Sequence, residues 1–145
     1  MNEFYRVLAP GGWAQLGEYG PWGYGPAIDK YMRIYSLLYK HNGIVLRAYA
    51  QLEDWMREAG FTNVRAIRGS YPLGAWAGDL GRDGVRNLWT HFRALKEQVL
   101  KAGGFGLVDS EEELDALIDA VRKEWDESNG SEAEFIYVIG QKPRS

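Results

Sequence analysis

The sequence predicts a small α/β fold with about three strands and about five helices. Segments with apolar residues at helical spacing are separated by three segments typical of strands. The last strand, AEFIYVIGQK at residues 133–142, is nearly all apolar, as expected of a strand buried on both faces. A chain of 145 residues is long enough to bury a core, so residues 1–145 are expected to form a single domain.

Composition excludes several classes of function. The formal charge is -3 and no basic stripe stands out, so we expect no nucleic-acid partner. No apolar stretch is long enough to cross a membrane, and the N-terminus lacks a signal peptide, which favours a cytoplasmic protein. The chain has no cysteine, which excludes disulfides, thiolate metal sites and cysteine nucleophiles.

The first elements are a helix, a turn and a strand. Residues 2–8 are typical of a helix end, which Pro10 and the two glycines after it break. From Trp13 to Glu18 the residues alternate, with Ala14, Leu16 and Glu18 on one face, which predicts a strand. GPWGYGP at residues 20–26 predicts a loop that carries two large aromatic side chains.

Two helices and a second strand follow. The spacing predicts a helix from Pro26 to about His41, ended by Asn42-Gly43. QLEDWMREAGF at residues 51–61 predicts another helix, which Gly60 closes with Phe61 folding back. Residues 62–71 alternate less cleanly and predict a strand, and AWAGDLGRDG at residues 75–84 predicts a loop.

The remaining elements are two helices and the final strand. From about Gly84 to Val99, apolar residues at helical spacing predict one long amphipathic helix, which KAGGFG stops. Ser110 and Glu113 form a capping box before the next helix. Its apolar stripe comprises Leu114, Leu117, Ile118, Val121 and Trp125.

Four segments in order resemble one family. FYRVLAPGGWAQLGE resembles the part of class I S-adenosylmethionine-dependent methyltransferases where a helix leads through a Leu-x-Pro-Gly-Gly turn into the fifth strand. LEDWMREAGFTNV is similar to the helix and Ala-Gly-Phe turn before the sixth strand, and AEFIYVIGQKP to the final strand. SYPLGAWAGD is similar to the Pro-x-Gly-x-Trp stretch of fungal LaeA-like secondary-metabolite methyltransferases, whose insertion the helices between residues 84 and 126 match.

The resemblance covers only the C-terminal half of that family. It implies a truncated Rossmann-like fold, with a mixed sheet whose last strand is antiparallel. The first four strands, the Gly-rich loop and the ribose-binding carboxylate are absent, so we expect no bound S-adenosylmethionine and no other cofactor. The strand from Trp13 to Glu18 would then present an unpaired edge, which predicts a homodimer or a hetero-complex that covers it.

Three residues are candidate acids or bases. Glu18 ends the first strand beside Tyr19, where the family geometry would place it at the cleft, although a solvated carboxylate has the same pattern. His41 lies at a helix C-terminus, which also favours a histidine for structural reasons. His91 flanks the apolar stripe of the long helix and is either a pocket base or a boundary residue. The two histidines share no metal-site spacing.

Aromatic residues are the main compositional feature, with six Trp, nine Tyr and five Phe. Most are expected in the core, but aromatic residues on glycine-rich loops often line ligand pockets. The candidate substrate-binding residues are Tyr19, Trp22, Tyr24, Tyr71, Trp76 and Trp89. Arg47, Arg65 and Arg68 are either solvated or functional, and the sequence does not separate these alternatives.

The residues favour one function and leave two alternatives open. The favoured hypothesis is a small-molecule enzyme of natural-product metabolism, a cofactor-independent cyclase, isomerase or lyase with an aromatic pocket and one acid/base. It predicts a closed apolar pocket. The second is a partner subunit that completes a methyltransferase, which predicts an exposed apolar patch. The third is a fragment of a methyltransferase proper.

Overall fold

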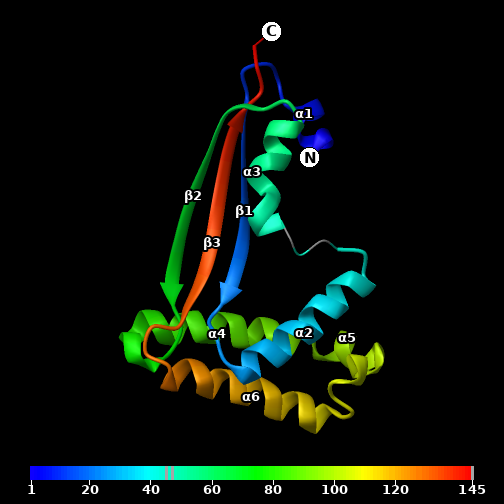
Figure 1. Ribbon diagram of the computed structural model, residues 1–145, viewed down its shortest axis with the longest axis vertical. Helices are drawn as coiled ribbons and strands as arrows, with labels where there is room; N and C mark the ends of the chain where they lie inside the picture. Colours follow the sequence, from blue (N-terminus) through cyan, green and yellow to red (C-terminus); the bar gives the residue numbers. More distant parts are fainter. Residues whose placement is uncertain (45, 47, 145) are drawn as a thin grey trace. The chain divides into compact units, whose positions relative to one another are not determined.

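The computed structural model describes residues 1–44, 46 and 48–144, and it confirms a mixed α/β fold (Figure 1). Its β-strands are β1 (Trp13–Trp22), β2 (Thr62–Pro72) and β3 (Glu132–Gln141). Its helices are α1 (Asn2–Val7), α2 (Pro26–His41), α3 (Ala48–Glu58), α4 (Gly78–Ala94), α5 (Lys96–Lys101) and α6 (Glu111–Glu127), with 3₁₀ turns η1 (Ala75–Ala77) and η2 (Gly103–Gly106).

The sheet has the order β1-β3-β2, so the last strand lies between the two earlier ones. Lys142 N donates to Gly12 O at 2.8 Å, and Gly23 N donates to Glu132 O at 2.8 Å, so β1 and β3 are antiparallel. Figure 1 shows β2 antiparallel to β3 as well. The prediction of an antiparallel last strand is confirmed. The prediction of a mixed sheet is wrong, because the central position of β3 makes both strand pairings antiparallel.

The prediction that β3 is buried on both faces is also wrong. Ile136 and Val138 are 1% and 0% exposed, whereas Tyr137 between them is 44% exposed. Ile136 and Val138 pack with Leu52 and Met56 of α3. One face of β3 is therefore covered by a helix, and its other face keeps apolar side chains that are not fully buried.

The chain divides into two compact units, each with its own core. The first comprises Met1–Gly20, Arg47–Ser70 and Glu134–Ser145, and the second comprises Pro21–Leu46 and Tyr71–Ala133. The first unit is built from most of the sheet with α1 and α3, and its core includes Phe61. The second is built from α2, α4, α5 and α6, and its core includes Trp125.

Hydrogen bonds join the N-terminal and C-terminal segments of the first unit. Gly11 takes a positive φ of 81° in the Pro-Gly-Gly turn, and its N–H donates to Lys142 O at 2.9 Å. The ammonium group of Lys142 donates to Tyr5 O and Leu8 O, at 2.8 Å each. These carbonyls end α1, so the C-terminal segment caps the first helix.

Two predicted boundaries change, the end of β1 and the start of α4. Gly20–Trp22 continues β1 and is not loop. Helix α4 begins at Gly78 and not at Gly84. Gly81 and Gly84 are buried, and an added Cβ would overlap Gly74 O at the first position and lie 2.6 Å from Pro72 O at the second. The glycines taken as loop signals therefore let the helix approach the preceding turn closely.

The single long helix predicted before KAGGFG is interrupted. Leu95 separates α4 from α5, and its N–H donates to Phe92 O at 3.2 Å, three residues back. The break places Lys96 Nζ 2.9 Å from a Glu111 oxygen and 2.6 Å from an Asp115 oxygen. The hydrogen bonds that Lys96 donates to Asp115 and Glu111 raise the pKa of Lys96.

Helix α6 matches its prediction. Ser110 Oγ accepts from Glu113 N at 3.2 Å, which confirms Ser110 as the N-cap. Glu113 accepts from Asp109 N at 2.9 Å, so its carboxylate caps the residue before Ser110, whereas a capping box requires that it cap Ser110 itself. All members of its apolar stripe are buried in the core of the second unit. The prediction that Gly60 ends α3 is also confirmed, because Phe61 N donates to Met56 O at 3.1 Å.

Candidate functional site around His91

His91 lies on α4 among aromatic side chains of the second unit. Its ring centroid is 6.1 Å from that of Trp22 and 5.9 Å from that of Tyr35. Leu88 and Phe92 of the same helix are buried, so His91 flanks the buried stripe and is only half-buried. This burial lowers the pKa of His91 from its ordinary value of 6.5, so the imidazole is neutral at neutral pH and can accept a proton.

Trp22 is held in the core by α6. Its side chain is 5% exposed and lies against Tyr35 at a centroid distance of 5.1 Å. The indole N–H of Trp125 donates to Trp22 O at 2.9 Å, and the adjoining Gly23 packs against the same indole. The structure therefore brings together two of the predicted residues, Trp22 and His91, within one aromatic cluster.

The other loop aromatics lie in different surroundings. Tyr24 is 72% exposed. Trp76 is 39% exposed and its indole N–H donates to Leu73 O at 2.8 Å. Tyr71 is half-buried against the core of the second unit. The Tyr71 and Trp76 side chains therefore have structural roles in packing and in turn geometry, and these roles do not depend on a ligand.

Glu18 and Tyr19 belong to the first unit, where both are exposed. Residue alternation along β1 places Glu18 on the same face as Ala14 and Leu16, as predicted, and this face packs against the core of the unit. His41 belongs to the second unit, is exposed, and lies 6.2 Å from Phe105 between ring centroids.

The three arginines that the sequence could not separate differ in surroundings. Arg65 is exposed on β2. Arg68 pairs with Glu53 of α3 at 3.6 Å, within the first unit. Arg47 lies outside the described residues. None of these observations assigns the arginines to a ligand site.

A groove between α4 and α6 contains Trp89. Its volume is about 770 Å³, and three arginines and three aspartates line it together with Trp89, Val85 and Ala75. Trp89 Nε1 donates to Asp119 Oδ1 on α6 at 3.4 Å. The favoured enzyme hypothesis predicted a closed apolar pocket, whereas this groove is open and has a charged rim.

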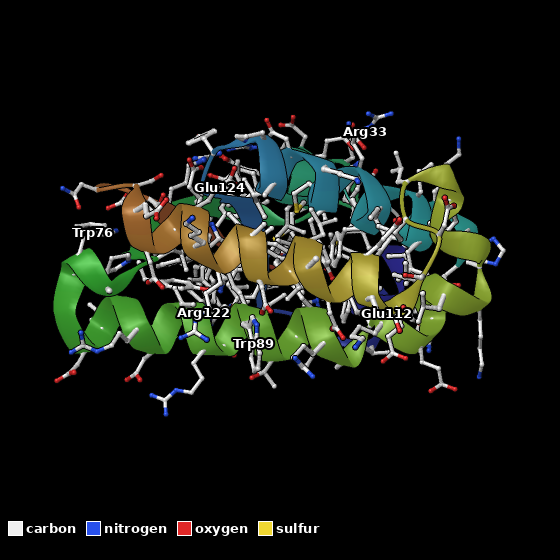
Figure 2. All side chains as sticks on the ribbon, turned by 90° about the horizontal axis from the view of Figure 1, so that it is seen from below. Arg33, Trp76, Trp89, Glu112, Arg122 and Glu124 are labelled. Carbon is white, nitrogen blue, oxygen red and sulfur yellow. The ribbon has the colours of Figure 1, made fainter. Side chains whose placement is uncertain are left out.

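The sequence did not predict the role of Glu124. Its carboxylate accepts from Ala27 N at 2.8 Å and from Ile28 N at 2.9 Å, and so caps the start of α2 from another helix (labelled in Figure 2). The signal was available, because α2 starts at Gly25-Pro26 with no Ser, Thr, Asp or Asn as its own cap. Such a start implies a cap from elsewhere in the chain.

The part of the chain that the structure describes has neither a metal-binding group of side chains nor a membrane-spanning helix. There, no three or more His, Asp or Glu side chains are grouped so that they could hold a metal ion. No helix in the described ranges is both long and apolar enough to cross a bilayer. A comparison with known protein families and with curated proteins finds no match to this chain.

Proposed function

We propose that this chain forms the acceptor-substrate half of a class I S-adenosylmethionine-dependent methyltransferase and that a cofactor-binding half covers its sheet. Four sequence segments in order support the proposal, and so does the antiparallel last strand expected from the same resemblance. The observation that carries it is the incomplete covering of the sheet in the first unit.

The uncovered side of the sheet carries large apolar side chains. We call it the open face and define it by Trp13, Tyr19, Ile67 and Tyr137, which are 52%, 50%, 57% and 44% exposed. Residue alternation puts them all opposite the face that α3 covers. Contiguous exposed apolar surface of this kind marks an interaction site.

Strand β1 adds an unprotected edge to the open face. It lies at the end of the sheet order and is ten residues long. Glu18 is its one charged side chain, it has no lysine, and its proline, Pro21, lies next to its last residue and leaves the edge from Trp13 to Gly20 without one. Natural edge strands are usually short or carry charges that prevent pairing, so a long edge with one charge is suited to a partner strand.

The occupant that fits both features is a half-domain with its own strands and covering helices. A strand of it would pair with β1, and its helices would cover the open face. This half would supply the Gly-rich loop and the carboxylate that hold S-adenosylmethionine, since the chain described here has neither in the required context. The acceptor would be a small molecule.

The proposal can be tested by reconstitution. The probe is a polypeptide with the first four strands of a class I methyltransferase of the resembled group, mixed or co-expressed with this chain. We expect a one-to-one complex by light scattering, and saturable S-adenosylmethionine binding by calorimetry only in that complex. Saturable binding by this chain alone would contradict the proposal, and so would a mixture in which no complex forms.

A second candidate function is favoured by the surroundings of His91. A neutral imidazole beside Trp22 and Tyr35 is suited to proton transfer on an apolar substrate. The chain would then be a cofactor-independent cyclase, isomerase or lyase of natural-product metabolism, and a homodimer would cover β1. A stable dimer that ignores both the cofactor and the cofactor-binding half would favour this candidate.

A further inference from the structure

The groove between α4 and α6 is a separate feature of the second unit. Arg82, Val85, Arg86 and Trp89 have the spacing of one face of α4 and line one wall. Arg122 of α6 lies on the other wall. Figure 2 shows Trp89 and Arg122 between the two helices. A volume of about 770 Å³ is in the range of small-molecule sites.

The floor and the rim of the groove differ in chemistry. Val85 is 5% exposed and Trp89 is half-buried, so the groove has apolar surface at its base. Arg93 lies over the Trp89 ring at 4.7 Å but does not line the groove, so the groove meets a part of the indole that Arg93 leaves uncovered. A planar ring in the ligand could pack there.

The guanidinium groups are held only by weak partners. Arg82, Arg86 and Arg122 have side chains 56%, 73% and 57% exposed. Each pairs with an aspartate three or four residues away on its own helix, the Arg122 pair at 3.9 Å. Exposed pairs of this type contribute little, so a ligand anion can replace them. A planar guanidinium matches a carboxylate with two parallel hydrogen bonds.

The aspartates that line the groove differ in how strongly they would repel an anionic ligand. Asp126 Oδ1 accepts from Ala75 N at 2.8 Å, so part of its charge is taken up by the backbone. The Asp79 side chain is 95% exposed and therefore extends into solvent. Asp83 pairs with Arg86, and its side chain is 62% exposed, so a ligand carboxylate would replace Asp83 in an exposed ion pair. The arginines of the two walls are then the groups that can converge on a ligand in the groove.

We infer that this groove binds a small aromatic carboxylate, with the ring on Val85 and Trp89 and the carboxylate on Arg86 and Arg122. The inference goes beyond the proposed function and does not rest on it. All the lining residues belong to the second unit, and the open face and the β1 edge, Trp13–Glu18, belong to the first.

The test is calorimetric titration of the whole chain with 2-naphthoate. The matched probes are 2-naphthalenemethanol, which keeps the ring without the charge, and inorganic phosphate, which keeps a charge without the ring. We expect naphthoate to bind more tightly than either. Arg86→Gln and Arg122→Gln should each weaken binding about tenfold, because each removes one guanidinium contact.

Arg33→Gln is the control, since Arg33 is an exposed arginine on α2 that does not line the groove (Figure 2). It should leave the affinity unchanged. If Arg122→Gln does not fold, as judged by circular dichroism, Arg122→Lys keeps the charge and should still weaken binding. The inference is overturned if naphthoate fails to bind at millimolar concentration, if either matched probe binds as tightly, or if the arginine variants match the control.

Discussion

At the scale of single residues, the burial of the His91 imidazole changes its protonation. Desolvation by burial lowers the pKa of His91 from its ordinary value of 6.5. Its neighbours Trp22 and Tyr35 are buried aromatic residues and carry no charge that would stabilise an imidazolium. The buried surroundings of His91 therefore favour the neutral imidazole.

This burial predicts a pH dependence of stability. Because the pKa of His91 is lower in the folded chain than its ordinary value of 6.5, the unfolded chain binds more protons just below that pH. We expect the contribution of His91 to stability to be full above pH 6.5 and to be lost as the pH falls toward the folded pKa. Urea denaturation from pH 7.5 to 5 should show a shallower decline in His91→Gln. An NMR titration midpoint of His91 at or above 6.5 would contradict this.

Glu124 carries a second prediction at this scale. Its carboxylate is the cap for two backbone N–H groups of α2, at 2.8 and 2.9 Å. Glu124→Ala should lower the free energy of unfolding by about 1–2 kcal/mol, because these donors lose their acceptor. Thermal or urea denaturation measures the change. Glu127→Ala is the control, since Glu127 is exposed on the same helix and pairs only weakly with Lys123; an equal loss in both variants would refute the capping role.

At the scale of elements, glycines determine where α4 can pack. Gly81 and Gly84 are three residues apart, lie on one face, and contact the turn at Pro72–Gly74. A composition rule treats such glycines as loop signals, which is why residues 75–84 were predicted as a loop. A helix that closely approaches a turn also needs glycine, because glycine has no Cβ.

Gly81→Ala tests this explanation. At a solvent-exposed position inside a helix, this substitution would stabilise the folded chain, since alanine is the better helix former by about 1 kcal/mol. Here the new Cβ would overlap Gly74 O, so we expect a loss of roughly 1–3 kcal/mol. Asn87→Ala on the exposed side of α4 should be neutral or slightly stabilising. Denaturation midpoints of the two variants measure the difference, and a gain in Gly81→Ala would rule out the close packing.

At the scale of the whole molecule, the two units have different surface character. The first carries the open face and the β1 edge, whereas the second packs most of its aromatic residues in or against its core and forms the α4–α6 groove. Apolar surface left open on a sheet promotes association until a partner covers it. Association of the isolated chain is therefore expected to depend on the open face.

Ile67→Lys should reduce that association. Ile67 is 57% exposed on the open face, and Leu80, which is 63% exposed on α4, is the matched control. We expect Ile67→Lys to raise the dissociation constant of self-association about tenfold, because it removes apolar area and places a charge on the sheet. Leu80→Lys should have no such effect. Sedimentation equilibrium over a concentration series measures both, and a monomeric wild-type chain would contradict the role of the open face.

The sequence predicted the parts of the fold that depend on local chemistry. Helix α2 was predicted with both ends correct, because Pro26 starts it and Asn42-Gly43 ends it. The Ser110 cap of α6, the buried stripe of that helix and the Gly60 turn also depend on residues close together in the chain. Caps and apolar periodicity are local, so a sequence read alone can identify them.

Tertiary structure alone decided what depends on residues far apart in the chain. Strand pairing places β3 at the centre of the sheet, which makes the sheet antiparallel. The packing of α3 decides which face of the sheet is covered. The contact between Trp22 and His91 joins positions that are 69 residues apart. The cap that Glu124 provides for α2 joins positions that are 97 residues apart. The sequence thus determined the helix ends that local caps specify, while the extents of β1 and α4, burial, pKa and the two exposed surfaces were decided by packing, because a side chain's environment is set by its neighbours in space.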